Sequence, residues 1–278
     1  MRYVRVDSIP EILNALCEDG ARLLAGGTDL IVKMRSGLAA PTVLIDISDV
    51  ECLRGVSETD GVVEIGAATP EEDLLASALL RERLPLLAKV LGALGSVQIR
   101  NRGTLGGNLV NASPAADGAV PLLLYDAEVL LTSRNGDRVL SVESFLRGPG
   151  QTALEEFEFV RAVRLPIPDR PFQPFFHKVG RRRALTIAIA SVGALIHIED
   201  NRVMETRFAA GSVAPVPLRL RRLEDRLRGA PLSESMLAEC APLAAESVSP
   251  ISDVRASAEY RRAVVGGLVM RALRSTLS

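Results

Sequence analysis

Two glycine-rich segments contain the residues best suited to chemistry. The first reads Ala25-Gly26-Gly27-Thr28-Asp29, and the second reads Gly103-Thr104-Leu105-Gly106-Gly107-Asn108. Paired glycines let a backbone approach a ligand without an intervening Cβ atom. The sequence predicts an extended segment before each pair and a helix directly after the first, where free N–H groups favour an anion. Because no lysine lies near either segment, a diphosphate held mainly by backbone and hydroxyl donors fits this pattern.

Each glycine pair also has a simpler interpretation, in which it only forms a tight turn. For a single pair this is the more common outcome, since glycine often marks turns. Two such segments of similar type in one chain favour the ligand. The interpretation requires the two segments, far apart in the sequence, to converge on the same dinucleotide bridge.

A polar stretch follows the second segment and predicts the start of another helix. Ser113 would be the capping residue and Pro114 the first helical residue, which places Asp117 in the first turn. Asp117 would then either complement the helix dipole or accept hydrogen bonds from ribose or ribityl hydroxyls. The residues alone favour neither role.

Several classes of protein are excluded by composition and motifs. The net charge of −1 over 278 residues gives no footprint for nucleic acid. The chain has no Walker A loop, nucleophile elbow, HExxH motif or GxGxxG fingerprint. Three scattered cysteines and two histidines twenty residues apart predict no metal site: Cys17, Cys52, Cys240, His177 and His197.

The elements that must position these segments can be read from capping residues and periodicity. A first unit comprises a helix near 10–19, a strand near 22–25, a helix over 28–35 and a strand over 42–47, which together with the N-terminal strand make a β-α-β-α-β unit. A second unit is expected to contain a strand at 62–65, a capping box at 69–72, a helix over 84–94, and strands at 128–132 and 138–142 around Asn135-Gly136.

A cluster of prolines marks a domain boundary near 166–174, because proline fits neither a central strand nor a helix interior. The region after it predicts an α+β domain: three antiparallel strands at 175–179, 187–198 and 203–210, then helices near 217–228, 233–246 and 256–276. The N-terminus has no apolar h-region, and no apolar stretch is long enough to cross a bilayer. The sequence therefore predicts a cytoplasmic protein without membrane insertion.

Two long motifs in this order resemble a known family. Residues 98–117, together with 25–30 upstream, closely resemble the FAD-binding medium subunit of molybdenum hydroxylases, the family of xanthine, carbon monoxide and nicotine dehydrogenases. Phe176-His177-Lys178, Arg181-Arg182-Arg183 and the strand over 187–194 also look like the start of that family's C-terminal domain. The resemblance covers essentially the whole chain.

The resemblance implies an α+β fold of the vanillyl-alcohol-oxidase type. An FAD-binding domain would span residues 1–170, with subdomains at about 1–52 and 53–170, and a small C-terminal α+β domain with a three-stranded antiparallel sheet would span 171–278. It also implies that both glycine segments hold the diphosphate, that Asp117 binds a cofactor hydroxyl, and that Lys178 contacts the cofactor. The residues expected at FAD are Leu24, Ala25, Gly26, Gly27, Thr28, Asp29, Leu30, Leu94, Thr104, Gly106, Gly107, Asn108, Ser113, Asp117, Val160 and Lys178.

The family's chemistry implies an electron-transfer role, with no catalytic side chain and no metal ligand in this chain. Substrate would be hydroxylated at a molybdopterin cofactor in a large subunit, and electrons would pass through [2Fe-2S] clusters of a small subunit to the FAD held here. NAD⁺, a quinone or oxygen would accept them next. With three cysteines in this chain, the other centres would belong to partner chains, in a dimer of heterotrimers. Two alternatives remain open: a self-contained flavin oxidase or reductase of the same fold, and a non-catalytic nucleotide-binding protein.

Overall fold

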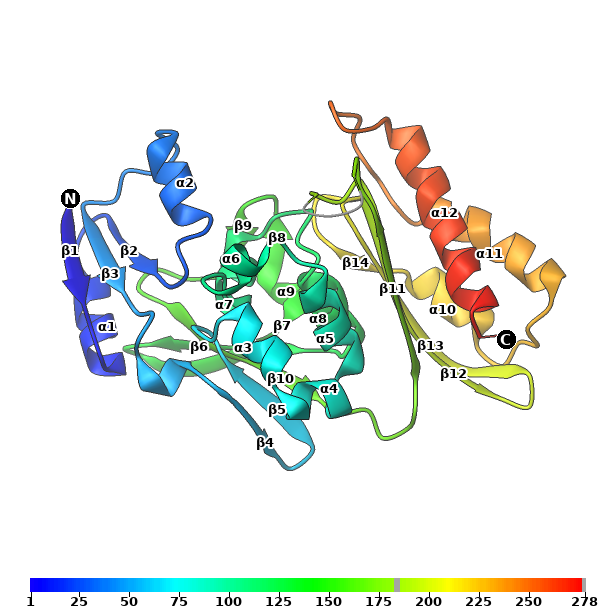
Figure 1. Ribbon diagram of the computed structural model, residues 1–278, viewed down its shortest axis with the longest axis horizontal. Helices are drawn as coiled ribbons and strands as arrows, with labels where there is room; N and C mark the ends of the chain where they lie inside the picture. The colour runs from blue at the N-terminus through cyan, green and yellow to red at the C-terminus, as the bar shows by residue number, and fades with distance from the viewer. Residues whose placement is uncertain (183–185, 277–278) are drawn as a thin grey trace.

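Three main β-sheets follow one another along the longest axis of the molecule (Figure 1). The computed structural model describes residues 1–182 and 186–276. Arg183, part of the arginine run that resembles the family, and Leu185 lie outside the described residues. Three hydrophobic clusters centre on these sheets, so the molecule has an N-terminal, a middle and a C-terminal part, and the middle cluster also contains residues from one face of the C-terminal sheet.

The N-terminal part is the predicted β-α-β-α-β unit. Its three strands are parallel in the order β1-β3-β2, with the last strand in the centre. The core under the sheet contains Ile12, Val43 and Ile45, which are buried. The first helix ends three residues earlier than expected, before a turn that reaches Gly20 at φ +69°. The elements are β1 (Arg2–Arg5), α1 (Ile9–Leu16), β2 (Ala21–Leu24), α2 (Leu30–Arg35) and β3 (Val43–Asp46).

The middle part has a five-stranded antiparallel sheet in the order β4-β5-β10-β6-β7, with helices packed on it. The predicted hairpin of β6 and β7 is confirmed, and its loop lies between the paired Ser133 and Gly136. The strands are β4 (Val56–Thr59), β5 (Val62–Gly66), β6 (Glu128–Ser133), β7 (Gly136–Ser141), β8 (Leu146–Gly148), β9 (Gln151–Thr152) and β10 (Phe159–Pro166). The helices are η1 (Glu51–Leu53), α3 (Glu71–Ala76), α4 (Ala78–Arg83), α5 (Pro85–Gly92), α6 (Val97–Arg100), α7 (Leu105–Asn111), α8 (Ala119–Leu124) and α9 (Val142–Phe145).

Two predicted helix starts in the middle part are wrong. The N-cap of α3 is Pro70, and the Thr69 hydroxyl contacts backbone groups of Gly55 and Gly66 instead of capping the helix. No helix begins at Ser113 and Pro114. The Ser113 hydroxyl accepts from the N–H of Ala115 in a local turn, and α8 begins only at Ala119. Asp117 therefore precedes the helix and is not in its first turn.

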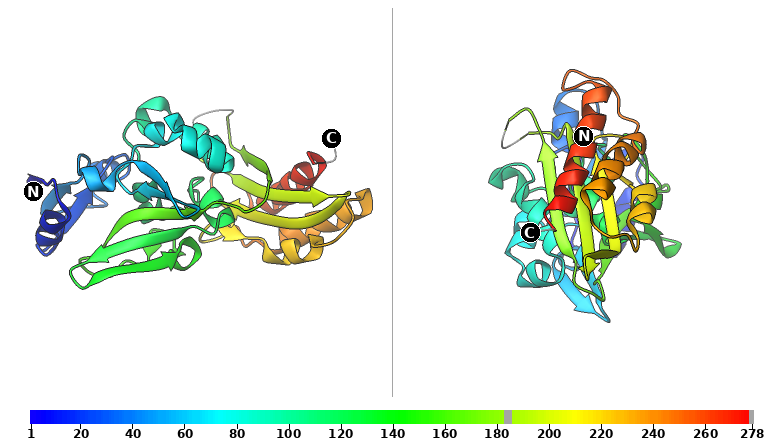
Figure 2. Two further views of the ribbon diagram at one scale, coloured as in Figure 1. Left: turned by 90° about the horizontal axis from the view of Figure 1, so that it is seen from below. Right: turned by 90° about the vertical axis from the view of Figure 1, so that its right-hand side faces the viewer.

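The C-terminal part contains the three predicted strands, and a fourth strand of two residues extends the sheet beside β13. That short strand occupies the beginning of the helix predicted over 217–228, which starts at Arg221. The helices α10, α11 and α12 lie on the face turned away from the middle part (Figure 2). The elements are β11 (Gln173–Val179), β12 (Ala190–Glu199), β13 (Arg202–Gly211), β14 (Leu218–Arg219), α10 (Arg221–Leu227), α11 (Glu234–Glu246) and α12 (Ala258–Arg274).

The opposite face of this sheet packs on α5 and α8 of the middle part. Cover on both faces explains why β12 is a nearly continuous apolar run. Two strand glycines make the contact close. A Cβ on Gly193 would lie 2.7 Å from Val120 Cγ1, and a Cβ on Gly211 would lie 3.2 Å from Val120 Cγ2. Within the described ranges, none of the helices combines the length and apolar character needed to cross a bilayer.

Candidate functional site

The two glycine-rich segments touch each other at the junction of the N-terminal and middle parts. A Cβ atom on Gly26 would lie 1.8 Å from the carbonyl oxygen of Arg102 and 3.0 Å from the Cα of Gly103. Only glycine permits this approach of two backbones. The predicted convergence of the segments is therefore observed.

A cleft of about 1010 Å³ opens at this junction. Most of the residues expected at the cofactor line it: Leu24, Ala25, Gly26, Gly27, Thr28, Asp29, Leu30, Leu94, Thr104, Gly106, Gly107, Asn108 and Val160. The other three, Ser113, Asp117 and Lys178, do not line the cleft. The structure thus brings the two glycine segments together with the apolar residues Leu94 and Val160 around one cleft.

The first segment presents its backbone to the cleft. Gly27 has a φ of +73°, in the left-handed region that favours glycine, and α2 begins three residues later. Within the described part of the chain, the N–H groups of residues 26–29 donate to no protein acceptor. Unpaired N–H groups that converge at a turn are suited to bind the oxygens of an anion.

The second segment differs from its prediction because most of it is helical. It follows the helix α6, not an extended segment, and α7 starts immediately after Thr104. Thr104 is the N-cap, and its hydroxyl accepts from the N–H of Gly107 at 3.0 Å. A Cβ on Gly106 would lie 2.6 Å from the carbonyl oxygen of Ala67, whereas a Cβ on Gly107 would meet only the Thr104 hydroxyl. Gly106 therefore allows α7 to pack closely against Ala67. At Gly107, the absence of a side chain leaves the cleft side of α7 open.

Asp117 and Lys178 form a buried ion pair between the middle and C-terminal parts. Lys178 Nζ lies 2.8 Å from Asp117 Oδ2 and donates to the carbonyl oxygen of Ala93 at 2.7 Å, one residue before the cleft residue Leu94. Burial raises the pKa of Asp117, and Lys178 only partly opposes this. The Oδ1 atom of Asp117 is buried and makes no hydrogen bond of normal length among the described residues, and the buried Ser191 hydroxyl, which also lacks a partner, lies close enough to lower the pKa of the carboxyl group.

Two further cleft residues were not predicted. Lys33 on α2 donates to Asn111 Oδ1 on α7 at 2.6 Å, so it links the helices that follow the two segments. The expectation that no lysine lies near the segments is therefore wrong. Glu71, the first residue of α3, is only 4% exposed and lines the cleft. A lysine on an amphipathic helix and a glutamate at a helix start are ordinary surface signals, so neither drew attention in the sequence.

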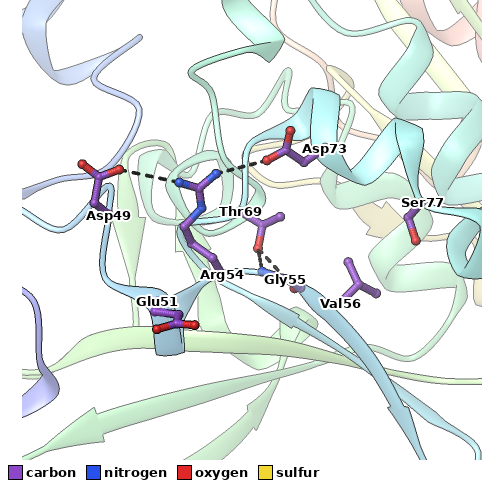
Figure 3. Close-up of a pocket in the computed structure, with 8 residues that line it drawn as sticks. All are labelled: Asp49, Glu51, Arg54, Gly55, Val56, Thr69, Asp73 and Ser77. Carbon is purple, nitrogen blue, oxygen red and sulfur yellow. Dashed lines mark hydrogen bonds and ion pairs between the residues drawn. The ribbon is translucent and has the colours of Figure 1, made fainter.

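A second hollow, of about 730 Å³, lies on the outer surface where the N-terminal and middle parts join (Figure 3). Arg54 bridges Asp49 and Asp73 there, with N–O distances of 3.6 and 3.1 Å. The Thr69 hydroxyl accepts from the N–H of Gly55 at 2.9 Å. These contacts hold the segment that follows β3 against α3. Because α3 begins with the cleft residue Glu71, they also support that wall of the cleft.

Comparison with known proteins identifies the class to which this fold and cleft belong. Residues 1–168 match the family described as FAD binding domain in molybdopterin dehydrogenase, and residues 175–276 match the CO dehydrogenase flavoprotein C-terminal domain. Together the two matches cover nearly all of the chain. The chain belongs to the family of FAD-binding medium subunits of molybdenum hydroxylases.

Individual relatives agree with this assignment. The chain is 33% identical to the glyceraldehyde dehydrogenase medium chain of Sulfolobus acidocaldarius over 98% of its own length and 96% of that protein. It is 34% identical to the carbon monoxide dehydrogenase medium chain of Hydrogenophaga pseudoflava, over 91% and 88%. The solved structure of carbon monoxide dehydrogenase from the latter organism superimposes with a TM-score of 0.94, at 32% identity over 99% of this chain and 96% of that chain.

The family, the α+β fold and the cofactor implied by the resemblance are thereby confirmed. The chain is an oxidoreductase subunit, and its cofactor is FAD. The residues of the cleft fit this cofactor. Unpaired N–H groups on the first segment and the open position at Gly107 suit a diphosphate.

Proposed function

We propose that FAD binds in the cleft with its diphosphate on the two glycine segments. The supporting observation is the backbone contact of Gly26 with Arg102, which places the unpaired N–H groups of the first segment beside α7. Lining residues Leu24 to Leu30, Leu94, Thr104, Gly106, Gly107, Asn108 and Val160 would surround the cofactor. Asp117 would accept from a cofactor hydroxyl while Lys178 holds it in place, and Ser113 would keep the turn before Asp117 in shape.

In the proposed role the chain passes electrons from [2Fe-2S] clusters of a small partner subunit toward NAD⁺, a quinone or oxygen. When bound, FAD supplies the exchange between two-electron and one-electron transfer. The residues of this chain bind and orient it. The names of the relatives support this role, because they are medium chains of dehydrogenases. The matched family, described as a domain in molybdopterin dehydrogenase, supports a large molybdopterin subunit as partner, and we propose that the chains assemble as a dimer of heterotrimers and not as a self-contained oxidase.

We also propose a domain division into residues 1–170 and 171–278, with subdomains at about 1–52 and 53–170. The division is supported by three sheets that are each the centre of a hydrophobic cluster, although a few residues of a neighbouring part join the middle and the N-terminal clusters. The two matched families, which end and begin at residues 168 and 175, support the main boundary.

Comparing two ligands on the purified full chain tests the FAD site. FAD binding is followed by flavin fluorescence, and bound FAD is displaced with ADP or with adenosine, which differ only in the diphosphate. If the glycine segments hold the diphosphate, adenosine binds at least about 100-fold more weakly than ADP, which corresponds to ~2.7 kcal/mol. Equal affinities of the two ligands would contradict the proposal.

The electron-transfer role needs a separate experiment on the assembled enzyme. The chain is expressed with the genes beside its own, and reduction of bound FAD is followed at its visible absorbance. Reduction by an organic substrate is expected only when the molybdopterin and iron–sulfur chains are present. Reduction of the isolated chain by a small substrate alone would favour the self-contained oxidase.

A further inference from the structure

Glu71 is a buried carboxyl group in the wall of the cleft, against the second glycine segment. Its backbone N–H donates to the carbonyl oxygen of Gly103 at 2.8 Å. A Cβ atom on Gly103 would lie 3.2 Å from Glu71 Oε2, so the carboxyl group lies directly against the residue before Thr104. The side chain is therefore held beside the residues proposed to bind the diphosphate.

Among the described residues, nothing donates a hydrogen bond to the Glu71 carboxyl group or forms an ion pair with it. Arg100, the cation that favours its ionised form, is already engaged: its Nε lies 2.7 Å from Glu72 Oε2, and its Nη1 donates to the carbonyl oxygen of Leu94 at 3.0 Å. The residue is 4% exposed, and its carboxyl oxygens are not among the completely buried atoms that lack a partner, so they are open to the cleft that Glu71 lines. A carboxyl group held without a protein partner in the wall of a cleft points to a ligand or a proton that satisfies it.

The charges around Glu71 come from four elements. Arg100 on α6 favours the ionised form, whereas Asp29 on the first segment opposes it. Glu72 on α3 pairs with Arg100, and Lys33 on α2 is occupied by Asn111. Burial is the largest influence and, with Asp29, raises the pKa of Glu71 to about 7. The group is thus protonated in part of the molecules at neutral pH.

We propose that Glu71 is an FAD-binding residue whose neutral carboxyl group donates a hydrogen bond to the diphosphate and whose ionised form repels it. The inference rests on the proposed FAD site and adds a residue and a pH dependence to it. A carboxylate beside a diphosphate would bring two anions together in a partly desolvated cleft, which is unfavourable. A protonated carboxyl group removes that repulsion, and its O–H group is free to donate a hydrogen bond to a diphosphate oxygen.

The sign of the pH dependence follows from proton linkage. A bound diphosphate favours the protonated form of Glu71, so FAD binding raises the pKa of Glu71 above its value in the free protein. The affinity is therefore constant below pH 7 and falls above it. Where the free protein is ionised and the complex is protonated, the dissociation constant rises by about tenfold per pH unit and one proton is taken up on binding.

The experiment measures FAD binding to the full chain between pH 6 and 9. The wild type is compared with Glu71→Gln, which keeps a neutral donor at every pH. Glu82→Gln is the matched control, because it makes the same substitution on the neighbouring helix α4 at an exposed side chain that forms no hydrogen bond or ion pair within the described residues. The wild type and the control are expected to lose about tenfold or more in affinity between pH 7 and 8.5, and Glu71→Gln is expected to stay level.

Proton uptake gives a second readout that needs no variant. Calorimetric titration of the wild type at pH 8 in buffers of different ionisation enthalpy is expected to show close to one proton taken up per FAD. Parallel pH profiles of wild type and Glu71→Gln, or an affinity that rises with pH, would overturn the role of Glu71 and leave the FAD site intact. Failure of the chain to bind FAD at any pH would overturn the FAD site as well.

Discussion

The two glycine pairs have the same letters but different tasks in the structure. In the first segment both glycines serve the backbone: Gly26 allows contact with Arg102, and Gly27 adopts φ +73°. In the second, Gly106 allows α7 to pack on Ala67, and only Gly107 remains open toward the cleft. A pair of glycines in a sequence therefore does not show by itself whether the glycines serve a turn, helix packing or an open ligand site. The difference can be tested one residue at a time.

The largest effect is expected for Gly26→Ala. The new Cβ would lie 1.8 Å from the Arg102 carbonyl oxygen, so the two segments must move apart. We expect a loss of roughly 3 kcal/mol in unfolding free energy, of the size found for severe overpacking, together with at least about 100-fold weaker FAD binding. Gly267→Ala is the control, because a Cβ there would meet nothing within 4 Å and alanine favours a helix. A melting temperature that is unchanged in Gly26→Ala would show that the contact is not real.

Glu71, which lies against the second segment, should make the stability of the chain depend on pH. The pKa of Glu71 in the folded chain, about 7, lies above its ordinary value of 4.5. The folded state binds the proton more tightly, so stability is fully present below pH 4.5 and declines as pH rises to 7. The loss is about 3 kcal/mol by the relation between pKa and free energy. Chemical unfolding of the FAD-free chain should show this decline in the wild type and not in Glu71→Gln.

A pair of variants separates the two glycines of the second segment. Gly106→Ala is expected to lower stability by about 1–3 kcal/mol, because its Cβ would lie 2.6 Å from the Ala67 carbonyl oxygen. Gly107→Ala should instead gain up to about 1 kcal/mol from helix propensity and bind FAD roughly tenfold more weakly, because the new methyl group faces the cleft. Denaturation and FAD titration of both variants check this. The opposite pattern would show that the roles are reversed.

The smallest effect is expected for Lys33→Met, which cuts the link between the helices after the two segments. Loss of the 2.6 Å hydrogen bond to Asn111 and of one positive charge in the cleft should weaken FAD binding by roughly three- to tenfold. The defect should shrink as salt is added, because salt screens partly exposed charges. A salt-independent defect would indicate that Lys33 only positions α7.

The sequence predicts local structure well where one signal dominates. Strand-forming residues around Asn135 predicted β6 and β7, and capping residues with helical periodicity predicted α1, α2, α5 and the three C-terminal helices. The β4–β5 hairpin was missed although Asp60-Gly61 is a strong turn signal, with φ values of +51° and +76°. The helix expected at Ser113 failed because its hydroxyl has a closer local partner, the N–H of Ala115.

The site itself could be predicted only in part, because some of its contacts join distant residues. The glycine segments were recognisable from their own residue types. The burial of Glu71 depends on Gly103, 32 positions away, and nothing in the local sequence announces that contact. Asp117 and Lys178 were suggested by family resemblance, and their ion pair spans 61 positions. Pairings of this kind follow from the fold and not from any short pattern.

The strand glycines at 193 and 211 have a consequence for how the cofactor site is assembled. They seat Val120 of α8 directly on the backbone of β12 and β13, while Lys178 on the neighbouring β11 reaches Asp117 just before that helix. Because no side chain separates α8 from these two strands, a sliding movement of the helix over the sheet would make Val120 collide with the strands. The sheet and α8 are thus held in one register, and with them the Lys178 side chain opposite Asp117.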